Sequence, residues 1–182
     1  ADRENTLRVV RSDHANLPEA PTVTDGTKET TVTQLQLPRT EANDCSNGMG
    51  YVVRLADGSF LIFDGGYAEQ ADQLWQTLVK QNGGENGIVI RAWCLTHAHG
   101  DHYGILQTFA NRYAGRVTLE RFIAAPVNAA DATDPCFNVT LPKVVALYAG
   151  AVLTVPHTGM VFRFCNLTLE ILFTPDERLI DG

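Results

Sequence analysis

The chain has 182 residues, the length of one ordinary globular domain, and 45% of them are hydrophobic, which excludes a mostly disordered protein. Fourteen basic side chains against 21 acidic ones give a net charge of −7, which argues against a surface for sequence-blind binding of nucleic acid. A nucleic-acid substrate held by metal ions is compatible with this charge but is not indicated by it. One uncharged stretch, 144–162, has the length of a membrane-spanning helix but contains Pro156 and two glycines. We interpret it as a helix end, a strand and a turn, and expect no membrane segment.

The four cysteines contain no C-x-x-C pair, which argues against a cysteine zinc site or a thioredoxin-type motif. Cys94 lies in an apolar run and is expected to be a buried, unreactive thiol. An even count allows two disulfides, but a chain of this length does not need them for its stability. We therefore expect a reducing, cytoplasmic compartment.

Residues 1–30 are rich in Thr, Asp, Glu and Pro without a sustained period, so we expect a linker or extended arm there, followed by one domain over 31–182. Asp57-Gly58 between two apolar runs predicts a tight hairpin, and apolar residues at helical spacing from Ala71 onward predict an amphipathic helix. The expected elements are a strand at 32–37, a hairpin of strands 51–55 and 60–63, a helix over 71–79, a buried strand at 88–95, a helix over 105–113, a strand at 117–125, a helix over 141–148, and strands at 161–164 and 167–173. This order predicts an α/β fold in layers.

The strongest chemical signal directly follows the buried strand expected at 88–95. There the chain reads Thr-His-Ala-His-Gly-Asp-His over 96–102, so three of the five histidines lie within six residues. The pattern H-x-H-x-D-H arises by chance in roughly 2 in 10,000 chains of this composition. The alternative is a set of surface histidines in a loop or at a helix N-terminus, which we consider the weaker interpretation.

The spacing of these residues suits metal binding. His97 and His99 are two positions apart where a strand ends, so their rings can lean to one side and share a cation, and neutral imidazole suits Zn²⁺. After the turn at Gly100, the side chains of Asp101 and His102 can face a second cation beside the first. Two-metal hydrolytic sites are built in this way.

Leu95–Gly104 resembles the first metal motif of the metallo-β-lactamase superfamily, and Phe63–Gly66 resembles the strand-end Asp-Gly motif that precedes it. Both motifs and the order of elements between them match, over roughly 34–173. The resemblance implies an αβ/βα sandwich whose active site lies along one edge of two facing sheets. It also implies that Asp64 orients a metal ligand, whereas its place before two glycines also allows a simple turn-former.

Carried over by position, His97 and His99 would bind a first metal ion, and Asp101 and His102 a second, with Asp101 also placed to handle protons. The expected cofactor is zinc, as one or two ions, with iron or manganese as alternatives. The resemblance implies a metal-dependent hydrolase that uses a metal-bound hydroxide on an ester-like or phosphodiester bond of a small molecule. Because the commonest true β-lactamases lack the histidine found here at position 102, a β-lactam is not the expected substrate.

The later ligand motifs of the family are not found in this sequence. The third, a histidine after a strand like 167–173, is replaced by Thr174–Arg178, where Glu177 is either an oxygen ligand or, as we favour, a loop acid. His157 lies in a Pro-His-Thr-Gly setting that favours a turn over a ligand. The chain thus resembles the N-terminal half of the sandwich, cut before the later motifs, and we favour truncation over degeneration of the site.

Because the chain supplies too few ligands for each ion, we expect it to hold metal weakly and to be inactive on its own. A longer parent protein would complete the site. The alternative function is a non-catalytic metal-binding or interaction domain that kept the histidine motif. An incomplete sandwich also predicts an uncovered sheet face, with Leu61, Phe63 and Val89 under too little protein. Exposed apolar patches drive association, so we expect a homo-oligomer through that face.

Overall fold

The computed structural model describes residues 29–35, 49–124 and 136–174, and the statements below concern these ranges. The arm expected at 1–30 lies outside them apart from Glu29 and Thr30, and so does the candidate ligand Glu177. Strands and helices alternate along the described chain, which confirms the predicted α/β class.

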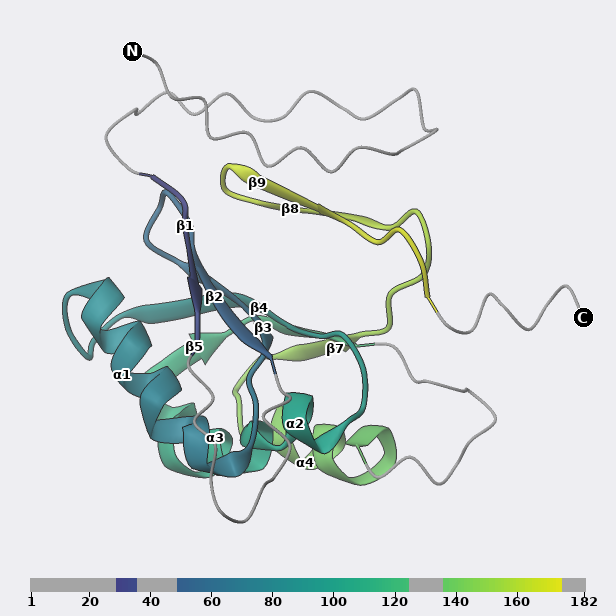
Figure 1. The fold of residues 1–182 in the computed structure, drawn as a ribbon, viewed down its shortest axis with the longest axis horizontal. Coiled ribbons are helices and arrows are strands. Elements are labelled where there is room, and N and C mark those ends of the chain that lie inside the picture. The colour runs from purple at the N-terminus through teal and green to yellow at the C-terminus, as the bar shows by residue number, and fades with distance from the viewer. Residues whose placement is uncertain (1–28, 36–48, 125–135, 175–182) are drawn as a thin grey trace, which may run out of the picture.

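A mixed sheet of seven strands lies at the centre of the described structure (Figure 1). Its order is β1-β2-β3-β4-β6-β7, and β5 also pairs with β4. The pairs β1–β2 and β2–β3 are antiparallel, whereas β3–β4, β4–β5, β4–β6 and β6–β7 are parallel. The strands are β1 (Thr31–Gln34), β2 (Gly50–Arg54), β3 (Phe60–Asp64), β4 (Ile88–Leu95), β5 (Val117–Leu119), β6 (Arg121–Ala124) and β7 (Val152–Thr154).

Helices cover one face of this sheet (Figure 1). The bounds are α1 (Ala71–Asn82), α2 (Gly100–Tyr103), α3 (Ile105–Tyr113) and α4 (Leu141–Val145), with short 3₁₀ turns at Ala68–Gln70 and Ala114–Arg116 and a π-helical turn at Cys136–Thr140. Trp93 of β4 packs edge-on against Phe109 of α3, with ring centroids 5.3 Å apart. Both side chains are fully buried, so this contact anchors the helical layer to the central strand. Within the described ranges, no helix has both the length and the apolar character needed to cross a bilayer.

A hairpin of β8 (Val161–Phe164) and β9 (Leu167–Glu170) lies on the opposite face of the sheet (Figure 1). Its Phe162 and Phe164 close a second apolar core, whose buried members are Val53, Leu55, Leu61, Ala92, Cys94, Ile123, Phe162 and Phe164. The expectation that Leu61 lies under too little protein is therefore wrong, because the hairpin buries it completely. Phe63 and Val89 are half-buried.

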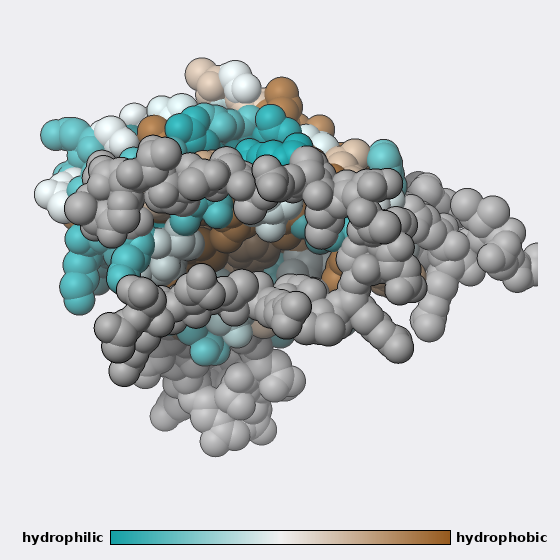
Figure 2. Space-filling view, turned by 90° about the horizontal axis from the view of Figure 1, so that it is seen from above, coloured by the Kyte–Doolittle hydropathy of each residue, from teal (hydrophilic) through white to brown (hydrophobic). Residues whose placement is uncertain are grey.

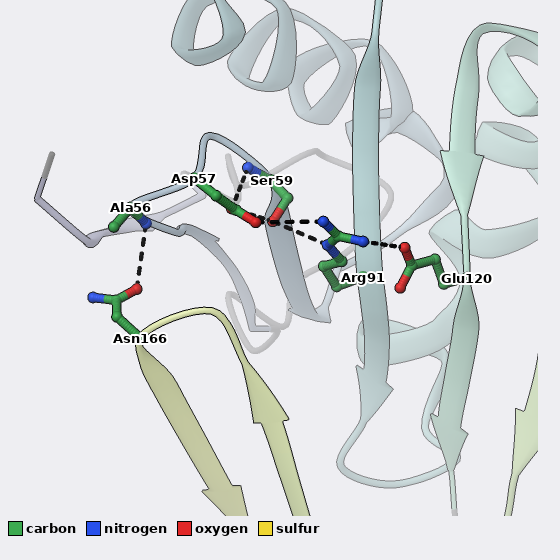
Figure 3. Close-up of polar contacts among 6 residues, drawn as sticks. All are labelled: Ala56, Asp57, Ser59, Arg91, Glu120 and Asn166. Carbon is green, nitrogen blue, oxygen red and sulfur yellow. Dashed lines mark hydrogen bonds and ion pairs between the residues drawn. The ribbon is translucent and has the colours of Figure 1, made fainter. Parts of the chain in front are cut away.

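Two sets of polar contacts lie at the end of the sheet opposite the carboxyl ends of β3 and β4 (Figure 3). Arg91, the charged residue of the otherwise apolar β4, forms ion pairs with Asp57 of the β2–β3 turn and with Glu120 between β5 and β6. At the tip of the hairpin, Asn166 Oδ1 accepts hydrogen bonds from the Ala56 N–H at 3.3 Å and from the Thr30 hydroxyl at 2.9 Å. These contacts fix neighbouring elements at that end without using any of the candidate metal ligands.

Several expected bounds differ from the structure. The strand expected at 32–37 is β1, which ends at Gln34, and the helix expected over 141–148 is α4, which ends at Val145. The strand expected at 117–125 is divided into β5 and β6, because the N–H of Glu120 bonds to Ile90 while its carbonyl accepts a hydrogen bond from Val152. The chain thus changes its pairing at Glu120 and begins to bridge β4 and β7. The last strand ends at Glu170 rather than at position 173, and residues 171–174 have no regular structure.

Apolar side chains are exposed at the β7 edge and after β9. Val152, Val155, Leu172 and Phe173 are each about half exposed, at 49%, 50%, 51% and 58%. Figure 2, viewed from the side on which the hairpin lies, shows apolar surface bordered by hydrophilic surface. The structure therefore leaves apolar surface outside both cores, although the sheet face itself is largely covered.

Candidate functional site

The candidate site lies where two parallel neighbouring strands end. β3 ends at Asp64 and β4 ends at Leu95, and the register pairs Phe63 with Cys94. Because parallel strands place their carboxyl ends at the same edge, Asp64 comes beside Thr96 although 32 positions separate them. The parallel β3–β4 pairing is thus what brings the two sequence motifs together.

Asp64 has an unusual backbone and a buried side chain. Its φ is 54°, in the left-handed region that Asp tolerates better than most residues, and its side chain has no exposed surface. Its carbonyl oxygen accepts a hydrogen bond at 2.9 Å from the indole N–H of Trp93, which is fully buried in β4. This bond holds the backbone of Asp64 in place, and the carboxylate points toward the loop after β4.

The carboxylate of Asp64 receives several hydrogen bonds from that loop. Oδ1 accepts one from the Thr96 N–H at 2.8 Å, and Oδ2 accepts one from the Thr96 hydroxyl at 2.7 Å. Nδ1 of His102 lies 2.9 Å from Oδ2. A buried carboxylate is stable only when such donors surround it. The carboxylate of Asp64 thus contacts both Thr96 and His102, and its role toward a metal ligand stays a prediction.

The histidine side chains gather at this edge. The ring of His97 lies with its centroid 3.9 Å from that of His102 and 4.5 Å from that of His99. Asp101 Oδ2 is 3.5 Å from Nε2 of His102. The four residues that the sequence singled out therefore form one cluster, beside Asp64, at the start of α2.

The electrostatic setting keeps an imidazole neutral. Burial lowers the pKa of His97 below its ordinary value, and the neighbouring His102 and His99 lower it further, while Asp64 and Asp101 act in the opposite direction. The neutral ring is the form that coordinates a metal ion, because one nitrogen then keeps a free lone pair.

Glycines allow the strand ends and the helical layer to approach closely. A Cβ on Gly65 would collide with Cγ2 of Ile105, the first residue of α3. The carbonyl of Gly66, whose φ is 90°, accepts a hydrogen bond at 3.0 Å from the Ile105 N–H. The Asp-Gly-Gly sequence therefore both terminates β3 and forms a close contact with the start of α3.

Thr96 and Trp93 are site residues that the sequence reasoning did not identify. The available signal was the position of Thr96 between a buried strand and the first histidine, where a short hydroxyl can bond to a neighbouring strand end. Trp93 lies in the buried strand that the sequence predicts at 88–95, which suggests only a core residue. A buried indole N–H, however, needs a hydrogen-bond partner. Here that partner is the backbone of Asp64.

Of the two weaker candidate ligands, His157 alone lies in the described ranges, and it makes no contact with this cluster. His157 is exposed in the turn between β7 and β8, where its carbonyl accepts a hydrogen bond from Met160 at 3.1 Å. No ring contact or ion pair among the described residues joins it to His97, His99 or His102. Glu177 lies outside the described ranges.

The donor chemistry of the cluster fits zinc, whereas the ligand set is unfinished. Imidazole nitrogens and a carboxylate are typical zinc ligands, and the carboxylate–imidazole pair of Asp64 and His102 is typical of the support behind them. Within the described ranges, however, no three His, Cys, Asp or Glu side chains already form a group that could hold a metal ion. If zinc is the cofactor, His97, His99, Asp101 and His102 are the residues that would hold it.

Comparison with known proteins finds one matching family model and several solved structures with a similar fold. The sequence profile described as Metallo-beta-lactamase superfamily matches residues 44–130. None of the curated proteins matches this chain. Its fold is similar to that of a metallo-beta-lactamase from Cronobacter sakazakii mutated in its HARLDQ motif, with 18% identity and a TM-score of 0.45 over 71% of this chain and 48% of that one.

Two further solved structures are similar at the same identity of 18%. A Cronobacter sakazakii metallo-beta-lactamase described by its HARLDQ motif has a TM-score of 0.44 over 71% of this chain and 49% of that one. A metallo-beta-lactamase from Hirschia baltica has a TM-score of 0.40 over 66% and 47%. The chain spans about half the length of the solved structures it matches. The segment that matches the model of the metallo-beta-lactamase superfamily, residues 44–130, contains Asp64 and the histidine cluster.

Proposed function

We propose that this chain carries the N-terminal part of the active site of a metal-dependent hydrolase, which acts on an ester-like or phosphodiester bond in the intact parent protein. The observation that supports it best is the gathering of His97, His99 and His102 at the carboxyl edge of β3 and β4, with ring centroids 3.9 and 4.5 Å apart. Packing three imidazoles this closely has no benefit for a solvent-exposed loop. It suits a site in which the rings share a cation.

The roles of the residues follow from their contacts. His97 and His99 would hold a first ion, and Asp101 and His102 a second. Asp64 lies behind this set and accepts a hydrogen bond from His102, so it would fix a ligand rather than bind substrate. When bound, zinc would supply Lewis-acid chemistry and a hydroxide nucleophile near neutral pH. Asp101, at the start of α2, would then accept or donate a proton during the reaction.

The substrate class rests on the same cluster. A site with His102 beside Asp101 can hold two ions, and two-metal sites cleave phosphodiesters, thioesters and lactones as well as lactams. Only the chemistry of this cluster, and no substrate pocket, supports the choice of substrate class. We therefore propose a small ester-like or phosphodiester substrate, and not a β-lactam.

A second candidate function is a non-catalytic metal-binding or interaction domain. One observation favours it: no three suitable side chains in the described ranges form a completed metal-binding group. In this case the histidine cluster would contribute to stability or to weak metal binding, without turnover.

The deciding experiment uses the full-length parent protein loaded with zinc. It is screened against bis-nitrophenyl phosphate, a thioester, a lactone and a β-lactam reporter. We expect turnover of a phosphodiester or ester-like reporter, and loss of at least about a hundredfold in kcat/KM in His97→Ala, because a ligand is removed. Gln76→Ala, an exposed position on α1, should retain full activity. If no reporter is turned over and His97→Ala changes only stability, the non-catalytic function is correct.

A further inference from the structure

We infer that the Thr96 hydroxyl is a positioning group that links the carboxylate of Asp64 to His97 through two hydrogen bonds, called the relay below. One buried carboxylate thereby sets the tautomer of two imidazoles. The relay runs from Asp64 Oδ2 to Thr96 Oγ1 at 2.7 Å, and from Thr96 Oγ1 to Nδ1 of His97 at 3.0 Å. A direct branch runs from the same Oδ2 to Nδ1 of His102 at 2.9 Å.

The direction of the relay follows from counting protons at Asp64. An ionised carboxylate has lone pairs and no proton, so each of its partners must donate. Its three close partners are the Thr96 N–H, the Thr96 hydroxyl and Nδ1 of His102. His102 therefore carries its proton on Nδ1, which leaves Nε2 as the nitrogen with a free lone pair.

The same count fixes the role of Thr96. A hydroxyl has one proton and two lone pairs. Its proton is directed to Oδ2 of Asp64, so a lone pair faces Nδ1 of His97 at 3.0 Å. His97 must then donate from Nδ1, and its Nε2 is left unprotonated. Nδ1 of His102 lies farther from this hydroxyl, at 3.5 Å, and uses the carboxylate instead.

The relay is held rigidly at its origin. Asp64 is fully buried at the end of β3, and the indole N–H of Trp93 holds its carbonyl at 2.9 Å. Thr96 is bonded to the carboxylate through both its N–H and its hydroxyl. Two bonds from one residue to one carboxylate fix the hydroxyl position, so the tautomer of His97 is set before any ligand arrives.

The consequence of the relay for metal binding rests on the proposed function: two rings that offer the same nitrogen need no proton rearrangement when an ion binds. The tautomers themselves do not depend on that function. They can be measured in the metal-free chain.

The test is long-range ¹H–¹⁵N NMR of the imidazole nitrogens in the metal-free 182-residue chain, at about pH 8, above the ordinary histidine pKa of about 6.5. We expect His97 and His102 to be protonated mainly on Nδ1. In Thr96→Val, the ratio of Nδ1-protonated to Nε2-protonated His97 should fall at least about fivefold, because one hydrogen bond is lost. His102 should keep its tautomer, and Thr96→Ser should restore that of His97.

Thr77→Val is the matched control. It also removes a threonine hydroxyl that donates one hydrogen bond, at 2.8 Å to Gln73 O in α1, and should leave both tautomers unchanged. The inference is overturned if His97 in the unaltered chain is protonated mainly on Nε2, which would mean that Thr96 donates to His97. It is also overturned if Thr96→Val folds and its His97 tautomer does not change.

The two proposals fail separately. If the rings are protonated on Nδ1 but the parent protein hydrolyses no reporter, the relay stands and the proposed hydrolase function is overturned. If a reporter is turned over but His97 is protonated on Nε2, the hydrolase function stands and the relay is overturned.

Discussion

At the scale of single residues, Asp64 combines two costly features, a left-handed backbone and a buried carboxylate, at a φ of 54° and zero exposure. The indole N–H of Trp93 in β4 holds the backbone, and donors from Thr96 and His102 surround the carboxylate. Residues held in such conformations cluster at functional sites. When Asp64 is replaced, most of the loss in stability should therefore come from the hydrogen-bond donors that lose their acceptor.

Asp64→Ala should lower the free energy of unfolding by roughly 2–4 kcal/mol, because the Thr96 N–H and hydroxyl and Nδ1 of His102 lose their acceptor. Urea unfolding of the metal-free chain measures this difference. Asp72→Ala is the control, since Asp72 also accepts two side-chain hydrogen bonds but is 57% exposed, so water replaces them. Equal losses in both variants would contradict the structural role given to Asp64.

The cysteines should differ sharply in reactivity. Burial, together with the charge of Asp64, raises the pKa of the Cys94 thiol to about 12. The thiolate is the reactive form, so at about pH 8 Cys94 should resist alkylation. Cys165 is free and exposed at the hairpin turn, and should be labelled quickly. Peptide mass mapping after brief iodoacetamide treatment distinguishes the sites, and rapid labelling of Cys94 in folded protein would show that the second core opens easily.

At the scale of elements, the close approach of β3 and α3 requires Gly65. Gly65→Ala places a methyl group against Ile105 and should cost about 1–3 kcal/mol of stability through overpacking. Because the strand end must shift, His102 should also lose its fixed orientation against Asp64. Urea unfolding measures the first effect and the imidazole NMR spectrum the second. Gly84→Ala, which has open space around its Cβ, should change neither.

Local signals in the sequence predicted most of these elements. The β2–β3 hairpin forms around Asp57-Gly58 as predicted, and Gly58 has the positive φ, 88°, that such a turn requires. β4 spans Ile88–Leu95 as predicted, because a strand paired on both sides in a covered sheet is mostly apolar, here with Arg91 as the exception. The break at Glu120 was not predictable, because it arises from pairing with β4 and β7, which lie far away in the sequence.

The same distinction applies to the candidate site. The proximity of His97, His99 and His102 follows from their spacing at the end of a strand. The contact between Asp64 and Thr96 depends on which strands are neighbours and on a left-handed backbone at Asp64. No pattern of side chains reveals that backbone conformation, so the Thr96 relay could be identified only from the structure.

At the scale of the whole molecule, the four clustered candidate ligands predict weak zinc binding. A catalytic zinc site normally uses three protein ligands, and each of the two proposed ions has two from this chain. Calorimetric titration of the metal-free chain should give a dissociation constant well above the nanomolar range, and His99→Ala should weaken it further. Nanomolar binding of two ions per monomer would mean that His157 or Glu177 completes the site.

The apolar side chains around β7 predict self-association. Val155 and Leu172 are each about half exposed, at 50% and 51%, and exposed apolar patches favour contacts between copies. Light scattering should show a dimer or a larger oligomer, which Val155→Glu combined with Leu172→Glu should convert to a monomer. Val32→Glu, at the β1 edge and 59% exposed, is the matched control. A monomeric unaltered chain would contradict this expectation.

The hydrogen bonds that build the site all lie within one continuous stretch of the chain, residues 64–105. The bonds from Trp93, Thr96 and His102 to Asp64 span 29, 32 and 38 positions, and Ile105 closes the unit by bonding to Gly66. Loop closure over such lengths costs only modestly more entropy than closure of a shorter loop. During synthesis, every donor and acceptor of the Asp64 cluster has emerged once residue 105 has left the ribosome, before β5–β9 have emerged. The cluster can therefore form as an early folding nucleus, on which the later strands assemble.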